Sequence, residues 1–170
     1  MIVGEYPFKE DMISNEIFSG RDGEELSKIL HKVGINRSDC YLTNVIKVRP
    51  RDNPIEEIFL DKNGTEPNAV FDRCISELKE EVTEVNPRLV IAIGKIALLI
   101  LTGRMDLSQC RGSRLRTLPQ FGSRKCIPTY HPAATKYNWE WKHLVRQDFR
   151  RAAYEAQSLD DKWLTPGVLP

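Results

Sequence analysis

Residues 89–94, LVIAIG, decide the fold class of this 170-residue chain. Five apolar residues in a row end at a glycine, and a second apolar run, residues 96–101, follows directly. A strand without polar alternation is typical of a parallel sheet covered on both faces, and the next run is expected to be a helix packed on that sheet. The chain is therefore predicted to be an α/β protein.

Segments on either side repeat this alternation of strand and helix. Apolar residues at helical spacing predict helices from a capping box at Asp22 to Gly34, after Pro67, and over residues 139–156. Together these elements predict a three-layer α/β/α fold with a central four-stranded parallel sheet. The other three strands are expected in residues 1–3, 40–46 and 125–127.

The domain boundary is predicted near the end of the last helix. Residues 1–157 are interpreted as one domain, and residues 158–170, which contain two prolines, as a C-terminal extension or linker. Residues 50–68 are rich in Pro, Asn, Asp and Gly and are expected to form a long loop. A strand that begins at residue 1 and a tail without a clear stop are expected of a fragment of a longer protein.

The composition excludes several classes of protein. Hydrophobic residues make up 41% of the chain and charged residues 29%, as in an ordinary globular protein. The net charge of +1 argues against a wholly basic nucleic-acid binder, although a local basic face can still bind phosphates. No signal peptide and no apolar run of about 20 residues are present, so a cytoplasmic protein without membrane contact is expected.

The cysteines are expected to be reduced thiols. They form no C-x-x-C motif and have no histidine close by in the sequence, so no zinc site is predicted. The four positions are Cys40, Cys74, Cys110 and Cys126.

Polar segments follow three of the predicted strands. They are residues 4–11 (GEYPFKED), residues 44–50 and residues 130–132 (YHP). Because ligands of open parallel sheets bind at the carboxyl ends of the strands, these segments are expected to converge on one site.

Four motifs in this order resemble the uracil-DNA glycosylase superfamily, and most closely its iron–sulfur branch from bacteria and archaea. They are MIVGEYPFKEDMISNEIF (residues 1–18), TNVIKVRP (43–50), NPRLVIAIGKIA (86–97) and TYHPAA (129–134). The resemblance covers roughly residues 1–155. It implies an enzyme that hydrolyses the N-glycosidic bond of uracil, or of a related modified pyrimidine, and a partner that is uracil-containing or single-stranded DNA.

The resemblance also implies roles for three residues of the base pocket. Phe18 matches the aromatic residue on which the flipped base stacks. Asn44 matches the asparagine that pairs with uracil, because an amide offers both the donor and the acceptor that O4 and N3–H require. His131 matches the histidine that hydrogen-bonds O2 as negative charge develops.

Further residues match positions around that pocket. Asp11 and its neighbour Glu10 are candidates for positioning or activating water, with solvated loop charge as the alternative. Contacts with DNA are expected from side chains whose alternative is ordinary surface solubility. The residues that border the base are Glu5, Tyr6 and Phe8, and those expected to bind DNA are Arg111, Arg114, Lys136 and Tyr137.

This chain departs from the iron–sulfur branch at the cluster ligands. The first two cysteines would precede Met1, the third position holds Val48, and only Cys74 stands at a ligand position. Because one thiolate cannot hold a cluster that takes four, no iron–sulfur cluster and no other cofactor are predicted. Tyr6 also stands where the branch has a small residue, which leaves catalytic competence open.

Two alternatives remain beside the enzyme. A non-catalytic glycosylase-like module would bind uracil or single-stranded DNA within a replication protein, like the domains fused to some bacteriophage DNA polymerases. It predicts DNA binding that weakens steeply with salt and no base release. An unrelated α/β hydrolase or nucleotide-binding domain lacks its expected GxGxxG, Walker or GxSxG motif.

Overall fold

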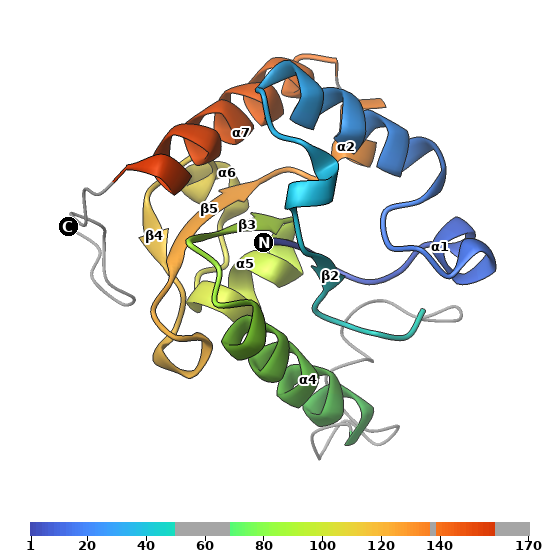
Figure 1. Ribbon diagram of the computed structural model, residues 1–170, viewed down its shortest axis with the longest axis vertical. Helices are drawn as coiled ribbons and strands as arrows, with labels where there is room; N and C mark the ends of the chain where they lie inside the picture. The colour runs from blue at the N-terminus through green and yellow to red at the C-terminus, as the bar shows by residue number, and fades with distance from the viewer. Residues whose placement is uncertain (50–68, 137–138, 159–170) are drawn as a thin grey trace.

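Helices lie on both sides of a central sheet in the computed structural model, which describes residues 1–49, 69–136 and 139–158 (Figure 1). The predicted α/β class is confirmed. The helices are α1 (Lys9–Ser14), α2 (Gly20–Lys32), α4 (Ala69–Val85), α5 (Lys95–Thr102), α6 (Leu107–Cys110) and α7 (Trp141–Gln157). Short 3-10 helices are η1 (Arg37–Asp39), η2 (Pro119–Phe121) and η3 (Pro132–Lys136).

The sheet has five strands in the order β2-β1-β3-β5-β4. The four predicted strands are parallel, and the fifth, β4, pairs antiparallel with β5 at the edge. The predicted count of four missed β4 because a two-residue strand shows no periodicity. The bounds are β1 Ile2–Gly4, β2 Leu42–Asn44, β3 Leu89–Ile93, β4 Leu115–Arg116 and β5 Lys125–Thr129.

Both faces of β3 are buried, as its continuous apolar sequence predicts. Leu89, Ile91 and Ile93 belong to a core cluster with residues of α2 and α7, such as Leu26 and Phe149. Alternate residues of the strand join a second cluster, which α4 and α5 complete on the opposite face. The sheet is thereby the middle layer of three.

The start of α2 differs from the prediction. The helix begins at Gly20 with Ser19 as its N-cap, not at Asp22. The amide of Gly23 donates to the carbonyl of Ser19 at 3.2 Å, which is already a bond of the first helical turn. The predicted capping box at Asp22 is therefore wrong, because the acidic residues that suggested it lie inside the helix.

Two predicted segments fall on residues that the structure does not describe. These are the loop of residues 50–68 and all but the first residue of the extension at residues 158–170, so the domain boundary stays a prediction. None of the helices in the described part of the chain has the length and apolar character that crossing a membrane requires.

Candidate functional site

The carboxyl ends of the parallel strands meet at one edge of the sheet. Gly4 at the end of β1 is in register with Asn44 at the end of β2, and Ile93 of β3 with Thr129 of β5. The polar segments that follow these strands therefore start side by side. The predicted convergence has a structural basis in this register.

Phe18 and Asn44 meet over the backbone of Gly4. A Cβ atom on Gly4 would lie 2.3 Å from Asn44 Oδ1 and 2.7 Å from Phe18 Cζ. Both side chains are nearly buried, with 4% exposure for Phe18 and 3% for Asn44. Within the described part of the chain no hydrogen bond engages the side-chain amide of Asn44, so it remains available to a ligand.

His131 completes this group with a row of aromatic rings. Its ring centroid lies 6.0 Å from that of Phe18, with the two planes inclined by 29°, and 5.3 Å from that of Phe8, which meets it edge-on. The Phe8 ring is in turn 5.7 Å from the Tyr6 ring. Tyr6 also packs against the core cluster on the α4–α5 face, so its phenol ring is partly buried.

The tautomer of a neutral His131 follows from a contact within its own loop. Nδ1 accepts the backbone N–H of Ala133 at 3.1 Å. A neutral imidazole whose Nδ1 is an acceptor carries its hydrogen on Nε2. His131 therefore presents Nε2 as a donor.

Glu5, directly after β1, contacts the N-terminus of α5. Its Oε1 accepts the backbone N–H of Ile96 at 2.9 Å, at the N-terminus of α5. Burial raises the pKa of Glu5 above its ordinary value of 4.5, against the lowering by the N–H groups of Ile96 and Lys95. This hydrogen bond joins the end of β1 to α5. We therefore expect Glu5 to affect the site by holding these two elements in place.

The two candidate acids of α1 have different surroundings. Asp11 is buried and accepts three hydrogen bonds, from Phe8 N at 2.9 Å, Ser19 N at 2.7 Å and Ser19 Oγ at 2.9 Å. Glu10 is exposed, and in the described part of the chain no group binds its carboxylate. Asp11 therefore binds backbone groups of the protein, whereas Glu10 faces solvent.

The predicted DNA-binding arginines are engaged within the protein. Arg111 forms a bidentate ion pair with the buried Asp148 and donates to Leu144 O at 3.1 Å. Burial raises the pKa of Asp148, and hydrogen bonds from Thr129 and Arg111 oppose that shift. Arg114 Nε donates to the buried Glu155 at 2.6 Å. Binding of DNA by these two side chains stays a prediction.

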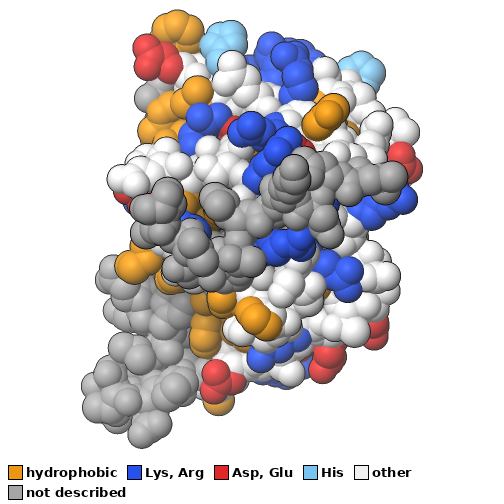
Figure 2. All heavy atoms as spheres, turned by 90° about the vertical axis from the view of Figure 1, so that its left-hand side faces the viewer, with side chains coloured by type: hydrophobic (Ala, Val, Ile, Leu, Met, Phe, Trp, Pro, Cys, Tyr) orange, Lys and Arg blue, Asp and Glu red, His pale blue; other side chains and the backbone are white. Residues whose placement is uncertain are grey.

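The side chains of the other two DNA-binding candidates lie outside the described part of the chain. Lys136 ends η3, but its side chain lies outside the described residues, as does the whole of Tyr137. Figure 2 shows the face that carries β4 and the end of α7, where Lys and Arg side chains are frequent. Two of them are anchored there, because Arg116 donates to Ser123 O and Lys125 to Ser158 O.

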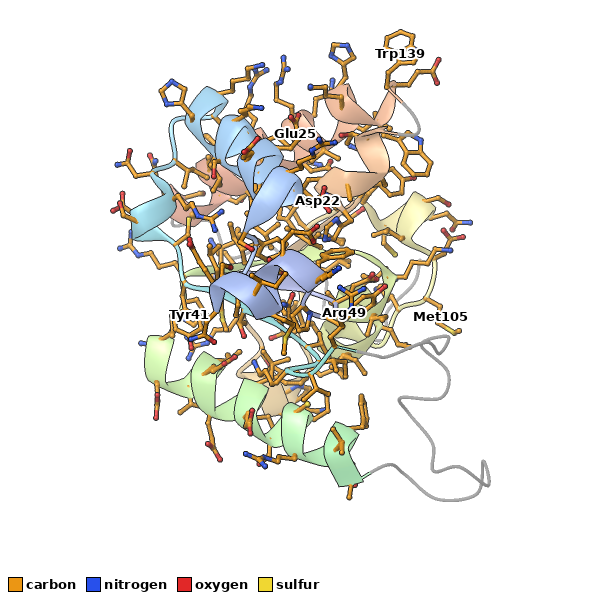
Figure 3. All side chains as sticks on the ribbon, turned by 90° about the vertical axis from the view of Figure 1, so that its right-hand side faces the viewer. Asp22, Glu25, Tyr41, Arg49, Met105 and Trp139 are labelled. Atoms are coloured by element: carbon orange, nitrogen blue, oxygen red, sulfur yellow. The ribbon has the colours of Figure 1, made fainter. Side chains whose placement is uncertain are left out.

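A hollow of about 470 Å³, which the sequence patterns did not reveal, is lined in part by Tyr130, the residue before His131. Its lining includes Lys95, Met105 and the stacked rings of Tyr130 and Trp141, whose centroids are 4.3 Å apart. Met105 is 76% exposed and projects into solvent, as does Trp139 at 72% (Figure 3). No periodicity links residues this far apart, so only the fold brings them together.

The positions in this chain that would hold an iron–sulfur cluster lie near the start of α4 and after β2. Cys74 is buried in α4, and its Sγ accepts the backbone N–H of Lys47 at 3.3 Å; Val48 follows Lys47 directly. Within residues 1–49, 69–136 and 139–158, no group of three or more His, Cys, Asp and Glu side chains could hold a metal ion. These residues do not fit a four-iron cluster, and its absence stays a prediction.

Comparison with known proteins gives a consistent family. A family model described as the uracil DNA glycosylase superfamily matches residues 1–156. The type-4 uracil-DNA glycosylase of Thermotoga maritima is 30% identical over 156 residues, covering 89% of this chain and 74% of the relative. The enzymes of that name from Archaeoglobus fulgidus and Saccharolobus solfataricus are 28% and 27% identical, each over 89% of this chain and over 73% and 68% of their own lengths.

Proposed function

The chain belongs to the uracil-DNA glycosylase superfamily, and from that premise we propose that it hydrolyses the N-glycosidic bond of uracil, or of a related modified pyrimidine, in DNA. The observation that carries this proposal is the meeting of the Phe18 ring and the Asn44 amide over Gly4, beside His131. The names of the relatives support the same reaction.

Recognition of the base falls to Phe18 and Asn44. A base that has left the DNA stack regains stacking on an aromatic ring, an interaction worth about 1–3 kcal/mol per base. The Asn44 amide can donate to O4 and accept from N3–H of uracil, whereas cytosine presents the opposite pattern. The lack of any internal hydrogen bond to this amide in the described part of the chain supports this role.

Cleavage of the bond leaves negative charge on uracil. As the C1′–N1 bond breaks, its electron pair stays on the base and spreads to O2, where the Nε2–H of His131 can donate. The oxygen of a water molecule bonds to C1′, and a proton of that water passes to a carboxylate that acts as the general base. We assign that base to the exposed Glu10, because both carboxylate oxygens of Asp11 already accept hydrogen bonds.

A base-release assay tests this function. A single-stranded oligonucleotide with one uracil is incubated with the protein and then cleaved by alkali, which nicks the strand wherever a base was lost. We expect nicking that falls about 10²–10³-fold for His131→Ala, the usual effect of removing an oxyanion donor. Asn44→Ala should also lose activity, whereas Gln120→Ala, at an exposed position of η2, should retain it.

The assay also separates the non-catalytic alternative. That alternative is supported by the edge-on contact of Phe8 with His131, which engages the ring that catalysis requires. An intact strand after treatment with the wild-type protein, under conditions in which a related active enzyme nicks it, would reject the enzyme and leave a binding module. A link to a bacteriophage DNA polymerase gains no support from the relatives named above.

A further inference from the structure

Phe18 adopts a backbone conformation that an aromatic residue avoids. Its φ angle is +55°, in the left-handed region, although its side chain is almost fully buried. Such a strained residue persists only where its surroundings hold it, and strain of this kind is frequent at functional sites. The groups that hold Phe18 are therefore informative.

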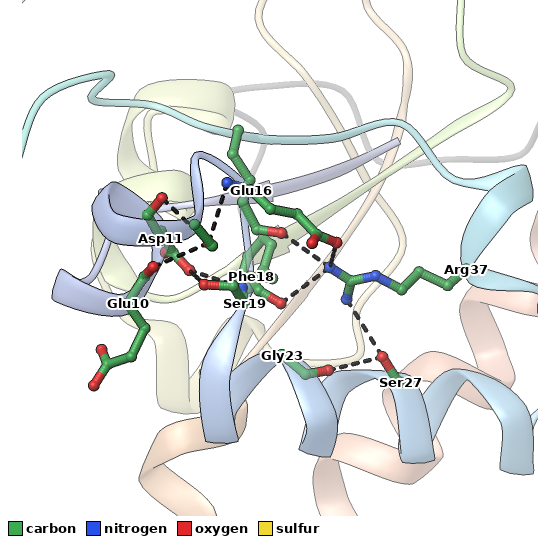
Figure 4. A network of polar contacts seen from close by, with 10 residues as sticks. Glu10, Asp11, Glu16, Phe18, Ser19, Gly23, Ser27 and Arg37 are labelled. Carbon is green, nitrogen blue, oxygen red and sulfur yellow. Dashed lines mark hydrogen bonds and ion pairs between the residues drawn. The ribbon is translucent and has the colours of Figure 1, made fainter.

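Arg37 holds the carbonyl side of this segment from η1. Its Nη2 donates to Ile17 O at 2.9 Å and to Phe18 O at 3.0 Å (Figure 4). Its Nη1 donates to Ser27 Oγ at 3.4 Å, and that hydroxyl donates to Gly23 O in α2. The planar guanidinium thus binds two consecutive carbonyls and α2 at once, a geometry that a lysine cannot reproduce.

Asp11 holds the amide side from α1. Its Oδ1 accepts both the backbone N–H and the hydroxyl of Ser19, the residue after Phe18. Its Oδ2 accepts the N–H of Phe8, whose ring lies against His131. Figure 4 shows Asp11 and Arg37 on opposite sides of the Phe18–Ser19 backbone.

Gly23 leaves the room that this arrangement needs. A Cβ atom on Gly23 would lie 1.5 Å from the Phe18 carbonyl oxygen, which no side chain could tolerate. The peptide groups on both sides of Phe18 are therefore fixed by α1, α2 and η1 together. The orientation of the Phe18 ring next to Gly4 and Asn44 is therefore fixed as well.

We propose that Arg37 is a positioning residue that holds Phe18 as the stacking surface for the extruded base, with Asp11 as its counterpart on the amide side. The inference rests on the function proposed above. Displacement of a positioned group by about 1 Å can cost as much as 10²-fold in rate. Besides its bonds to the Ile17 and Phe18 carbonyls and to Ser27, Arg37 forms an ion pair with the exposed Glu16 at 3.6 Å, and its effect on the base is expected to pass through the two carbonyls.

A double-mutant cycle tests the coupling. Arg37→Gln, Phe18→Leu and the double variant are compared by kcat, KM and melting temperature on the uracil-containing single strand. Arg37→Gln is expected to lower kcat/KM about tenfold or more, which corresponds to loss of about 1.4 kcal/mol of stacking. In the Phe18→Leu background the same change should have little further effect on kcat/KM.

The control is Arg73→Gln. Arg73 is an exposed arginine in an ion pair with Glu77 on α4, so its loss should leave kcat/KM unchanged. A loss from Arg37→Gln that is equally large in both backgrounds, or no loss while the variant is folded, would overturn the positioning role. A merely structural arginine would change the melting temperature in both backgrounds without this coupling.

A binding measurement keeps the inference separate from the reaction. Oligonucleotides with 2′-fluoro-2′-deoxyuridine, which resists hydrolysis, and with thymidine are titrated against the same proteins. If the wild type binds the uracil strand more tightly but releases no base, the enzymatic function fails. The positioning role then requires that Arg37→Gln lower the ratio of the two affinities about tenfold, and an unchanged ratio would overturn it. A wild type with neither release nor preference overturns both.

Discussion

Gly4 illustrates how a single residue sets the geometry of the site, because its missing side chain leaves room for two others. The amide of Asn44 and the ring of Phe18 both reach the space that a Cβ atom would fill. These two groups arrive from different elements, β2 and the segment between α1 and α2. Their alignment therefore depends on a position that contributes no chemistry itself.

Gly4→Ala is expected to reduce the rate of base release far more than Val3→Ala does. The new methyl group must displace Asn44 Oδ1 or Phe18 Cζ, which lie 2.3 Å and 2.7 Å from it. Steady-state kinetics and melting temperature measured on the same preparation check this. Val3→Ala is the control: the buried Val3 also lies in β1, so its loss costs about 1–3 kcal/mol of stability but leaves the site's geometry intact. Equal kinetic effects from both changes would contradict the expectation.

Glu5→Gln is expected to flatten the pH dependence of stability. Burial raises the pKa of Glu5 in the folded protein, so the folded state binds a proton more readily than the unfolded state. The stabilisation is complete below the ordinary value of 4.5 and is lost as pH rises through the folded pKa. The glutamine oxygen can still accept the Ile96 N–H but carries no charge to desolvate.

Urea unfolding at pH 4 and pH 7 measures this effect. The free energy of unfolding of the variant, relative to wild type, should rise between the two pH values. Glu77→Gln, in the surface ion pair with Arg73, serves as the carboxylate control. A variant whose relative stability falls as pH rises would show that Glu5 is stabilised as an anion, contrary to this account.

The sequence was sufficient to propose Phe18, Asn44 and His131 as a group, because the family resemblance points to all three and the strand ends point to Asn44 and His131. It could not distinguish Asp11 from Glu10, since the partner of Asp11 is Ser19, whose role as a helix N-cap was missed. Arg37 was missed entirely, because its bonds to the Ile17 and Phe18 carbonyls leave no mark on the pattern of side chains.

At the scale of elements, one buried ion pair joins α7 to the end of α6. Asp148 on α7 binds Arg111, the residue after α6, and also accepts the hydroxyl hydrogen of Thr129 at the end of β5. Arg151 adds a bond from α7 to Gly112 O at 2.7 Å. These contacts fix the helix against the strand that leads to His131.

Arg111→Gln is therefore expected to act on stability. Removing one partner of a buried pair leaves an uncompensated charge, with a cost of about 3–5 kcal/mol. Thermal unfolding measures the loss, and Arg150→Gln, at an exposed position of α7, should change little. If Arg111 instead binds a phosphate, the salt slope of DNA binding should fall by about 1 while stability holds.

The ion pairs of Arg111 and Arg114 explain why their roles could not be predicted. Their partners, Asp148 and Glu155, lie 37 and 41 residues further along the chain, beyond the reach of any local pattern. Helices α2, α4, α5 and α7 and the four parallel strands, by contrast, follow from local periodicity and were predicted. The short helices α1 and α6, the two-residue strand β4 and the start of α2 escaped it.

At the scale of the whole molecule, the numbers of positive and negative side chains are nearly equal. The net charge is +1, and several basic side chains pair with acids of other elements. Three such pairs are Lys47–Glu81, Arg111–Asp148 and Lys142–Glu25. A net charge this small gives little long-range attraction of DNA by the molecule as a whole, so electrostatic attraction depends on local faces such as the one in Figure 2.

The salt dependence of binding to a single strand can decide between the enzyme and the binding module. For single strands the logarithm of affinity falls with the logarithm of salt concentration by about 0.7 per neutralised phosphate. An enzyme that binds mainly through Phe18, Asn44 and His131 is expected to show a shallow slope, of magnitude below about 2. A module that holds the strand by its backbone should give a steep slope that is the same with uracil or thymine in the strand. Fluorescence anisotropy from about 50 to 200 mM salt, with the 2′-fluoro-2′-deoxyuridine and thymidine strands, measures both quantities. A steep slope without base preference would show that the backbone, not the pocket, binds this DNA.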